Sequence, residues 1–219
     1  HVSTRDKVTF YFDVSCPFCW ITSRWIKEVE KVRDIEVEWK PMSLSVLNEG
    51  RDDDPEGDPE GYLWIPVRVC AAVLENYGNE ALGRLYTAMW GRGSGASGWL
   101  GDLRRALDEA GLPRETAEAG MLTDYDAVVR SSHAEGVGLV GGHAGTPVIA
   151  VTSPDGERTA FFGPVISRVP RGEQAARLWD GTLLVAGIAG FHELKGLPHE
   201  EPELNTESQG SGPQSAILD

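Results

Sequence analysis

The 219-residue sequence predicts a mixed α/β fold in which a block of helices separates two groups of strands. A β-branched and aromatic run over 8–12 and an alternating run over 35–39 flank an amphipathic segment, the pattern of a β-α-β unit with parallel strands. From residue 66 to about 138, apolar residues recur at helical spacing and nothing indicates a strand. Two more strands, over 147–151 and 158–162, are joined by a turn-rich connection and followed by a helix after Pro170.

Two cysteines stand at the start of the first predicted helix, in Cys16-Pro17-Phe18-Cys19. Pro17 fits the first helical position because that residue needs no N–H donor. Cys16 then lies at the positive end of the helix dipole, which favours its thiolate. This placement is typical of a redox-active dithiol.

Two structural interpretations of the cysteine pair are weaker. A zinc site needs four ligands, and only Cys70 and five scattered histidines remain, so we expect no metal site. A structural disulfide across two residues would close a very small loop and remove little entropy from the unfolded chain. Cys70 lies in an apolar helical stripe, and we interpret it as a packed core thiol.

The helical block also carries signals for its boundaries. Asn79 is suited to cap one helix and Asp124 another, and the Gly/Ser-rich segment 91–101 is expected to interrupt the helices. The segment from Gly136 to Gly141 has the glycine spacing G-x-G-x-x-G of a dinucleotide-binding motif. It follows a predicted helix and precedes a predicted strand, which is the reverse of that motif, so we expect a linker there. Neither glycine pattern predicts a nucleotide cofactor.

Composition limits the partners. The net charge of −14 argues against nucleic acid or an anionic membrane surface as the main partner. The acidic loop from Asn48 to Gly61 lacks the spacing of a calcium loop and is interpreted as a solvated surface loop. No signal-peptide or transmembrane pattern is visible, which predicts a cytoplasmic protein, where disulfides are transient and catalytic. The tail from about Pro198 has a disorder-like composition.

The order of elements is that of a thioredoxin fold with an inserted helical subdomain. We expect residues 1–61 and 139–190 to form the thioredoxin-fold domain, 62–138 the helical subdomain and 191–219 a polar tail. In this fold the third strand runs antiparallel beside the first, so the start of the third strand faces Cys16. Thr146-Pro147 occupies that start, and a cis-proline there would present the Thr146 backbone to an extended substrate chain.

These features resemble the DsbA-like thioredoxin-fold oxidoreductases and, more closely, the mycothiol-dependent nitroreductases. The resemblance spans most of the chain outside the middle of the helical insert and the tail. It is carried by Cys16-Pro17-Phe18-Cys19-Trp20-Ile21-Thr22-Ser23-Arg24-Trp25, Met42-Ser43-Leu44, Pro66-Val67-Arg68-Val69, Leu85-Tyr86-Thr87-Ala88-Met89 and Phe161-Phe162-Gly163-Pro164-Val165. Phe18 departs from the Trp common in that family, which puts the redox potential and the preference for aromatic substrates in doubt.

The resemblance implies a mechanism. An exposed Cys16 thiolate attacks a substrate disulfide, Cys19 resolves the mixed disulfide, and mycothiol, a low-molecular-weight thiol co-substrate, regenerates the dithiol without a bound cofactor. Nitroaromatic compounds would accept electrons while bound over Phe18 and Trp20. Asp13 is a candidate to move the Cys19 proton, although an Asp after a strand is often only a turn former.

Other functions fit the same fold. A thiol-cofactor-dependent transferase or isomerase would need one activated thiol, so its activity would survive Cys19→Ser. A non-catalytic redox sensor that binds a partner through its helical subdomain would turn over with no thiol donor. An oxidase of exported proteins would need a signal for export, which is not visible in the sequence.

Overall fold

The computed structural model describes residues 4–91 and 99–206. Four strands form one sheet in the order β2-β1-β3-β4: β1 (Asp6–Phe12), β2 (Ile35–Pro41), β3 (Val148–Thr152) and β4 (Arg158–Phe162). β1 pairs parallel with β2 and antiparallel with β3, and β3 pairs antiparallel with β4. The four predicted strands and their directions are confirmed, because alternating and β-branched runs suit a sheet buried on its faces.

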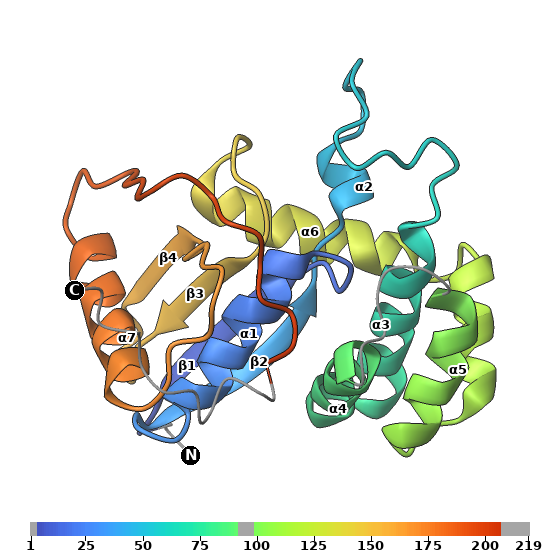
Figure 1. The fold of residues 1–219 in the computed structure, drawn as a ribbon, viewed down its shortest axis with the longest axis horizontal. Coiled ribbons are helices and arrows are strands. Elements are labelled where there is room, and N and C mark those ends of the chain that lie inside the picture. Colours follow the sequence, from blue (N-terminus) through green and yellow to red (C-terminus); the bar gives the residue numbers. More distant parts are fainter. Residues whose placement is uncertain (1–3, 92–98, 207–219) are drawn as a thin grey trace, which may run out of the picture.

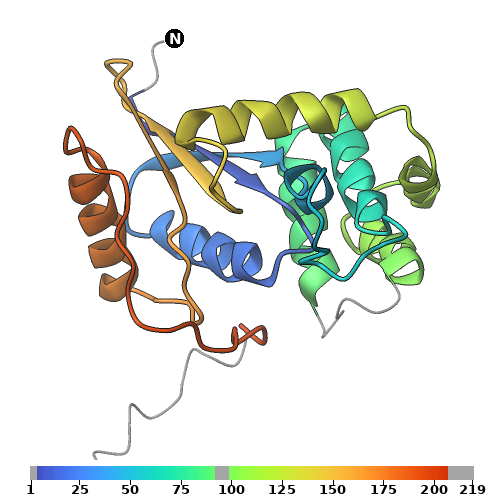
Figure 2. The same cartoon turned by 90° about the horizontal axis from the view of Figure 1, so that it is seen from above.

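Helices cover both faces of this sheet. α1 (Pro17–Val29) and α7 (Glu173–Ala186) lie on one face and α6 (Asp126–Val140) on the other, as Figure 2 shows. α1 and α7 are joined by a hydrogen bond from the Trp25 indole to the Ala175 carbonyl at 3.1 Å. The arrangement is the predicted thioredoxin fold, with its dithiol segment between β1 and α1.

The predicted helical insertion packs beside the sheet (Figure 1). It contains α3 (Trp64–Tyr77), α4 (Asn79–Trp90), α5 (Trp99–Glu109) and a 3-10 helix (Arg114–Met121), and the short α2 (Leu44–Leu47) precedes it. Residues 92–98 of the Gly/Ser-rich segment lie outside the described residues. One hydrophobic core runs from β1 through Trp39 and Tyr86 into α4 and α5. This core is continuous between the sheet and the helical insertion. The division of the chain into two domains stays a prediction.

Three local predictions are wrong. The segment from Gly136 is no linker, because α6 continues to Val140 and ends at Gly141 with φ 89°. Asn79 does not cap α4; its side chain accepts from the Trp39 amide at 2.7 Å and donates to the Val37 carbonyl at 2.9 Å, which ties α4 to β2. Tyr125, rather than Asp124, precedes α6, and it makes no side-chain cap.

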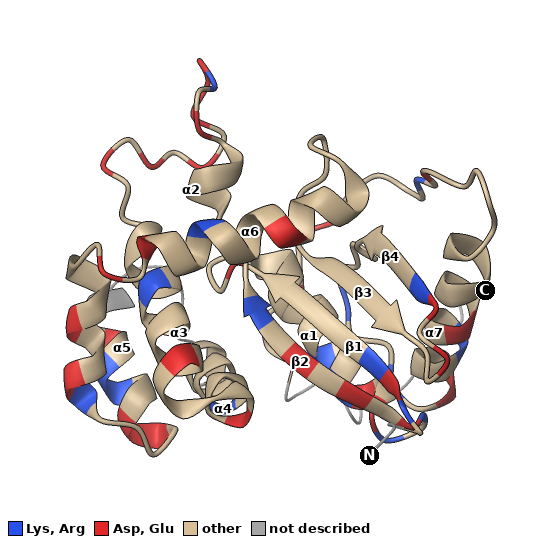
Figure 3. Ribbon diagram, turned by 180° about the vertical axis from the view of Figure 1, so that it is seen from behind, with Lys and Arg blue, Asp and Glu red and all other residues tan. Residues whose placement is uncertain are grey.

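Part of the tail is ordered, although its composition is typical of disordered segments. Residues 198–206 lie extended against α1 and the loop after β4, and Thr206 is buried there. Nothing in the local pattern of Glu, Pro and Asn indicated this contact. Acidic residues follow one another along the loop after α2, and acidic and basic residues alternate on the helical insertion, as Figure 3 shows. Within residues 4–91 and 99–206, no helix is long and apolar enough to cross a membrane.

Candidate active site

The turn between β1 and α1 presents the two cysteines. The amide of Cys16 donates to the Asp13 carbonyl at 3.0 Å, and Cys16 has extended backbone angles (φ −78°, ψ 118°) as the N-cap of α1. Pro17 follows at the first helical position, as predicted. The Cys16 Sγ accepts the amide hydrogen of Cys19 at 3.4 Å. The first cysteine therefore caps the helix that contains the second.

The two thiols are unequal. Cys19 is fully buried and Cys16 is only 7% exposed, so the expectation of an exposed Cys16 is wrong. A hydrogen bond from the Cys19 thiol lowers the pKa of Cys16, and the Thr146 hydroxyl and the Cys19 amide lower it further against the effect of burial. Burial raises the pKa of Cys19 well above its ordinary value, and the neighbouring Cys16 adds to the rise. The arrangement favours a thiolate on Cys16 and a thiol on Cys19. All three cysteines are free.

Thr146 and Pro147 lie beside the thiols. The pairing of Val148 with Tyr11 brings the start of β3 next to the end of β1, and the Thr146–Pro147 peptide is cis. Thr146 is 6% exposed. Among the residues that the structure describes, neither the amide nor the carbonyl of Thr146 bonds to another backbone group. That these groups pair with an extended substrate chain lying across Cys16 stays a prediction.

Asp13 is buried next to the dithiol turn. Its Oδ1 accepts the Ser15 amide at 2.8 Å and its Oδ2 accepts the Leu44 amide at 2.7 Å. Burial raises the pKa of Asp13 to about 6, although both amide bonds favour the ionised form. In the described structure the carboxylate makes no hydrogen bond to Cys19. The structure places Asp13 near the thiols, and its role in proton transfer stays a prediction.

The two aromatic residues predicted to bind substrate have different surroundings. Phe18 is half-buried, and its ring lies 5.7 Å from the ring of His199. Trp20 is buried: it stacks on Trp90 at 5.8 Å, and the Arg24 guanidinium lies 4.1 Å from its ring centroid. Sequence reasoning found Phe18 and Trp20 but not the groups that surround Trp20.

Three of the missed neighbours come from distant parts of the chain. Trp90 and Tyr86 belong to the apolar stripe of α4, and the Trp90 indole donates to the Val14 carbonyl at 2.7 Å. The Tyr86 hydroxyl is buried and has no hydrogen-bond partner among the described residues. Helical spacing predicts that the Tyr86 ring is buried, but it predicts neither the burial of Trp90 nor the packing of both rings on Trp20 of α1. The third neighbour is the carbonyl of Leu204, for which the sequence carries no signal.

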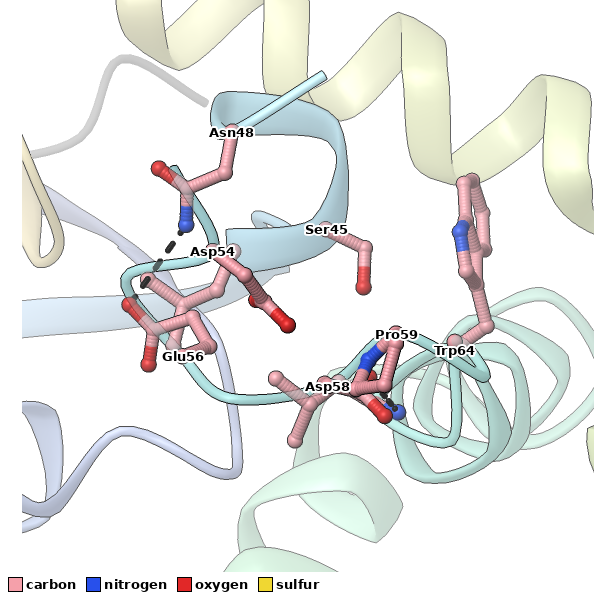
Figure 4. Close-up of a pocket in the computed structure, with 10 residues that line it drawn as sticks. Ser45, Asn48, Asp54, Glu56, Asp58, Pro59 and Trp64 are labelled. Carbon is pink, nitrogen blue, oxygen red and sulfur yellow. Dashed lines mark hydrogen bonds between the residues drawn. The ribbon is translucent and has the colours of Figure 1, made fainter. Parts of the chain in front are cut away.

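A separate pocket is lined by Ser45, Asn48 and Trp64, among other residues (Figure 4). It has a volume of about 210 Å³ and is bounded by α2, the acidic loop and the start of α3. Its carboxylates come from Asp54, Glu56 and Asp58, and Asn48 donates to Glu56 at 3.5 Å. Within the described parts of the chain, no group of three His, Cys, Asp or Glu side chains could hold a metal ion.

A dithiol at a helix start, a neighbouring Thr-cis-Pro and a helical insertion in a thioredoxin fold define a DsbA-like thioredoxin-fold oxidoreductase. The model of the Rv2466c-like family, described as mycothiol-dependent nitroreductase Rv2466c, matches residues 15–196. The chain therefore belongs to the Rv2466c-like family. This family and the fold support thiol-disulfide redox function.

Individual proteins are similar to this chain in sequence or in fold. The uncharacterized protein Rv2286c of Mycobacterium tuberculosis is 31% identical over 195 residues, which cover 86% of this chain and 80% of that protein. A putative protein disulfide isomerase from Nitrosomonas europaea has a similar fold, with a TM-score of 0.53, 15% identity and coverage of 82% of this chain and 98% of its own. The thiol-disulfide exchange protein alpha-DsbA2 from Wolbachia pipientis is similar in fold at a TM-score of 0.52, 14% identity and coverage of 83% and 82%.

Proposed function

We propose that this protein reduces disulfides with Cys16 as the nucleophile and Cys19 as the resolving thiol, and that mycothiol regenerates the dithiol. The observation that carries the proposal is the hydrogen bonding of Cys16 Sγ at the start of α1, which favours its thiolate. A burial-raised pKa keeps Cys19 protonated until the mixed disulfide forms. The two thiols would thus act in a fixed order.

The proposed reaction is a series of thiol-disulfide exchanges that begins and ends with the reduced dithiol. The Cys16 thiolate attacks one sulfur of the substrate disulfide, forms a mixed disulfide and releases the other sulfur as a thiolate. Cys19 loses its proton and attacks Cys16 Sγ, which releases the reduced substrate and leaves an intramolecular disulfide. One mycothiol then opens this disulfide as a mixed disulfide, and a second restores the thiol and leaves as mycothiol disulfide. The family description supports mycothiol as the donor.

Nitroreduction by the same pair is the second part of the proposal. Two thiols supply two electrons and two protons, which convert a nitro group to a nitroso group and water and leave the Cys16–Cys19 disulfide. Phe18 and Trp20 would bind the aromatic ring, and Thr146 with Pro147 would hold an extended disulfide substrate. Asp13 would accept the Cys19 proton after a small shift or through a water molecule. The cytoplasmic location stays a prediction.

The donor is tested by oxidising the protein and following its reduction by mycothiol, glutathione or a thioredoxin system. We expect mycothiol to reduce it fastest, and reduction by thioredoxin alone would refute the donor but not the dithiol mechanism. We expect Cys16→Ser to abolish turnover and Cys19→Ser to accumulate a mixed disulfide on Cys16, while Cys70→Ser, the matched control, keeps activity. Turnover that survives Cys19→Ser would favour a one-thiol transferase or isomerase instead.

A further inference from the structure

A C-terminal segment crosses the face of α1 that carries the dithiol. Residues 198–206, here called the strap, run from beyond α7 across α1, as the red ribbon shows in Figures 1 and 2. The match to the family model ends at residue 196, so the strap lies outside it. Its role cannot be taken over from the family description.

The strap touches the two aromatic residues of the proposed substrate face. The ring of His199 lies 5.7 Å from that of Phe18 at 56°, and the Leu204 carbonyl accepts the Trp20 indole N–H at 3.3 Å. The inner side of Trp20 is closed by Trp90. With the strap in place, Trp20 is only 3% exposed. Because Trp90 and the Arg24 guanidinium already pack on the Trp20 ring, the strap covers the indole edge of Trp20 and the ring of Phe18.

The strap is anchored to the loop between β4 and α7. The Glu203 amide donates to the Ser167 carbonyl at 2.8 Å, and Arg171 donates to the Thr206 carbonyl. Arg168 pairs with Glu200 at 3.0 Å and with Glu203 at 3.7 Å.

The ion pairs are exposed and therefore weak. The side chains of Arg168 and Glu200 are 63% and 61% exposed, and water and salt screen such pairs strongly. The strap thus has specific anchors but few that are deeply buried, which is the pattern of a segment that opens locally while the rest of the protein stays folded.

We propose that the strap is a lid that covers the Phe18–Trp20 face and admits substrates to the dithiol according to their size. A small thiol reagent reaches Cys16 with the lid in place, whereas a bulky aromatic ligand or a polypeptide disulfide requires the lid to open. This inference rests on the proposed function only in taking Cys16 as the reactive thiol.

The test compares a bulky and a small reagent on the same cysteine. Cys16 is labelled at pH 6 with fluorescein maleimide and with iodoacetamide, and its modification is followed by mass spectrometry. Removal of residues 198–219 is expected to raise the maleimide rate at least about 10-fold, because the lid is held by several hydrogen bonds. The iodoacetamide rate is expected to change less than about 2-fold, since the small reagent does not need the lid to open.

Charge variants keep the chain length and provide matched controls. Replacing both ion-paired acids, as E200K/E203K, is expected to raise the maleimide rate by about 2- to 5-fold. E201K reverses the charge of the acid next to Glu200, whose side chain makes no described ion pair or hydrogen bond, and it should leave the rate unchanged. Adding R168E to the double variant should restore the slow rate.

Two results distinguish the two proposals. A ratio of maleimide to iodoacetamide rates that is the same in the full chain, the truncated chain and E200K/E203K would overturn the lid. Slow labelling of Cys16 by iodoacetamide in the truncated chain, no faster than that of Cys70, would instead overturn Cys16 as the nucleophile. The charge variants decide the first question even where truncation disturbs folding.

Discussion

Asp13 gives the sharpest prediction on stability, because an ionisable group fully buried beside the dithiol must make folding depend on pH. Burial raises its pKa from 3.8 to about 6, although its two oxygens accept the backbone amides of Ser15 and Leu44. Asp13→Asn keeps the size of the side chain and removes its ionisation. The variant therefore isolates the cost of a buried charge.

The sign follows from proton binding. Between pH 3.8 and 6 the folded protein holds the Asp13 proton and the unfolded chain releases it, so this group makes the protein less stable as pH rises through that window. A pKa difference of about 2 at about 1.36 kcal/mol per pKa unit corresponds to about 3 kcal/mol. Relative to the native protein, Asp13→Asn should gain less than about 1 kcal/mol from this effect at pH 4 and about 3 kcal/mol at pH 8.

The assay is urea unfolding of the reduced protein at a series of pH values from 4 to 8, with the native protein and the variant side by side. Asp13→Asn also loses an acceptor for one backbone amide, which adds an offset of about 1–3 kcal/mol that does not change with pH. Asp52→Asn, on the exposed acidic loop, is the matched control for removing one carboxylate without changing a buried side chain. A difference between Asp13→Asn and the native protein that stays flat from pH 4 to 8 would refute the reasoning.

Three more predictions concern separate parts of the molecule. Iodoacetamide near pH 6 should modify Cys16 well before Cys19, since hydrogen bonds lower the pKa of the first thiol and burial raises that of the second; peptide mapping that finds the reverse order would contradict this. Gly136→Ala should destabilise the protein by about 1–3 kcal/mol in thermal unfolding, because its Cβ would lie 3.0 Å from the Tyr11 ring, whereas Gly138→Ala on the open side of α6 should stabilise it by about 0.5–1 kcal/mol. Equal effects of the two glycine substitutions would show that close packing at α6 is not the cause. Asn79→Leu should cost about 1–3 kcal/mol, because it leaves the Trp39 amide and the Val37 carbonyl without their partner; a change below about 0.5 kcal/mol would mean that water replaces both bonds.

Local pattern was enough to predict the framework of the site. Alternating and β-branched runs predicted the strands, and Pro17 after Cys16 predicted where α1 begins, because both signals act within a few residues. The antiparallel pairing of the third strand then predicted that Thr146 and Pro147 lie beside the cysteines, and the pairing of Val148 with Tyr11 agrees. These predictions needed only secondary structure and the order of the elements.

The surroundings of the thiols depended on contacts between residues far apart in the chain. Helical periodicity indicated that Tyr86 is buried, whereas Trp20 was expected on the substrate face and its stacking on Trp90 was not predicted. The bond from Trp20 to Leu204 joins residues 184 positions apart, and the polar composition of the tail gives no apolar pattern from which to predict it. Asn79 likewise resembles a cap in sequence, yet the approach of α4 to β2 gives its amide two better partners. Sequence alone therefore determined which residues form the dithiol and which helix presents it. Tertiary packing decided the degree of exposure of Cys16 and the cover over Trp20. The physical reason is that a local pattern specifies which face of an element is buried but not which residues bury it.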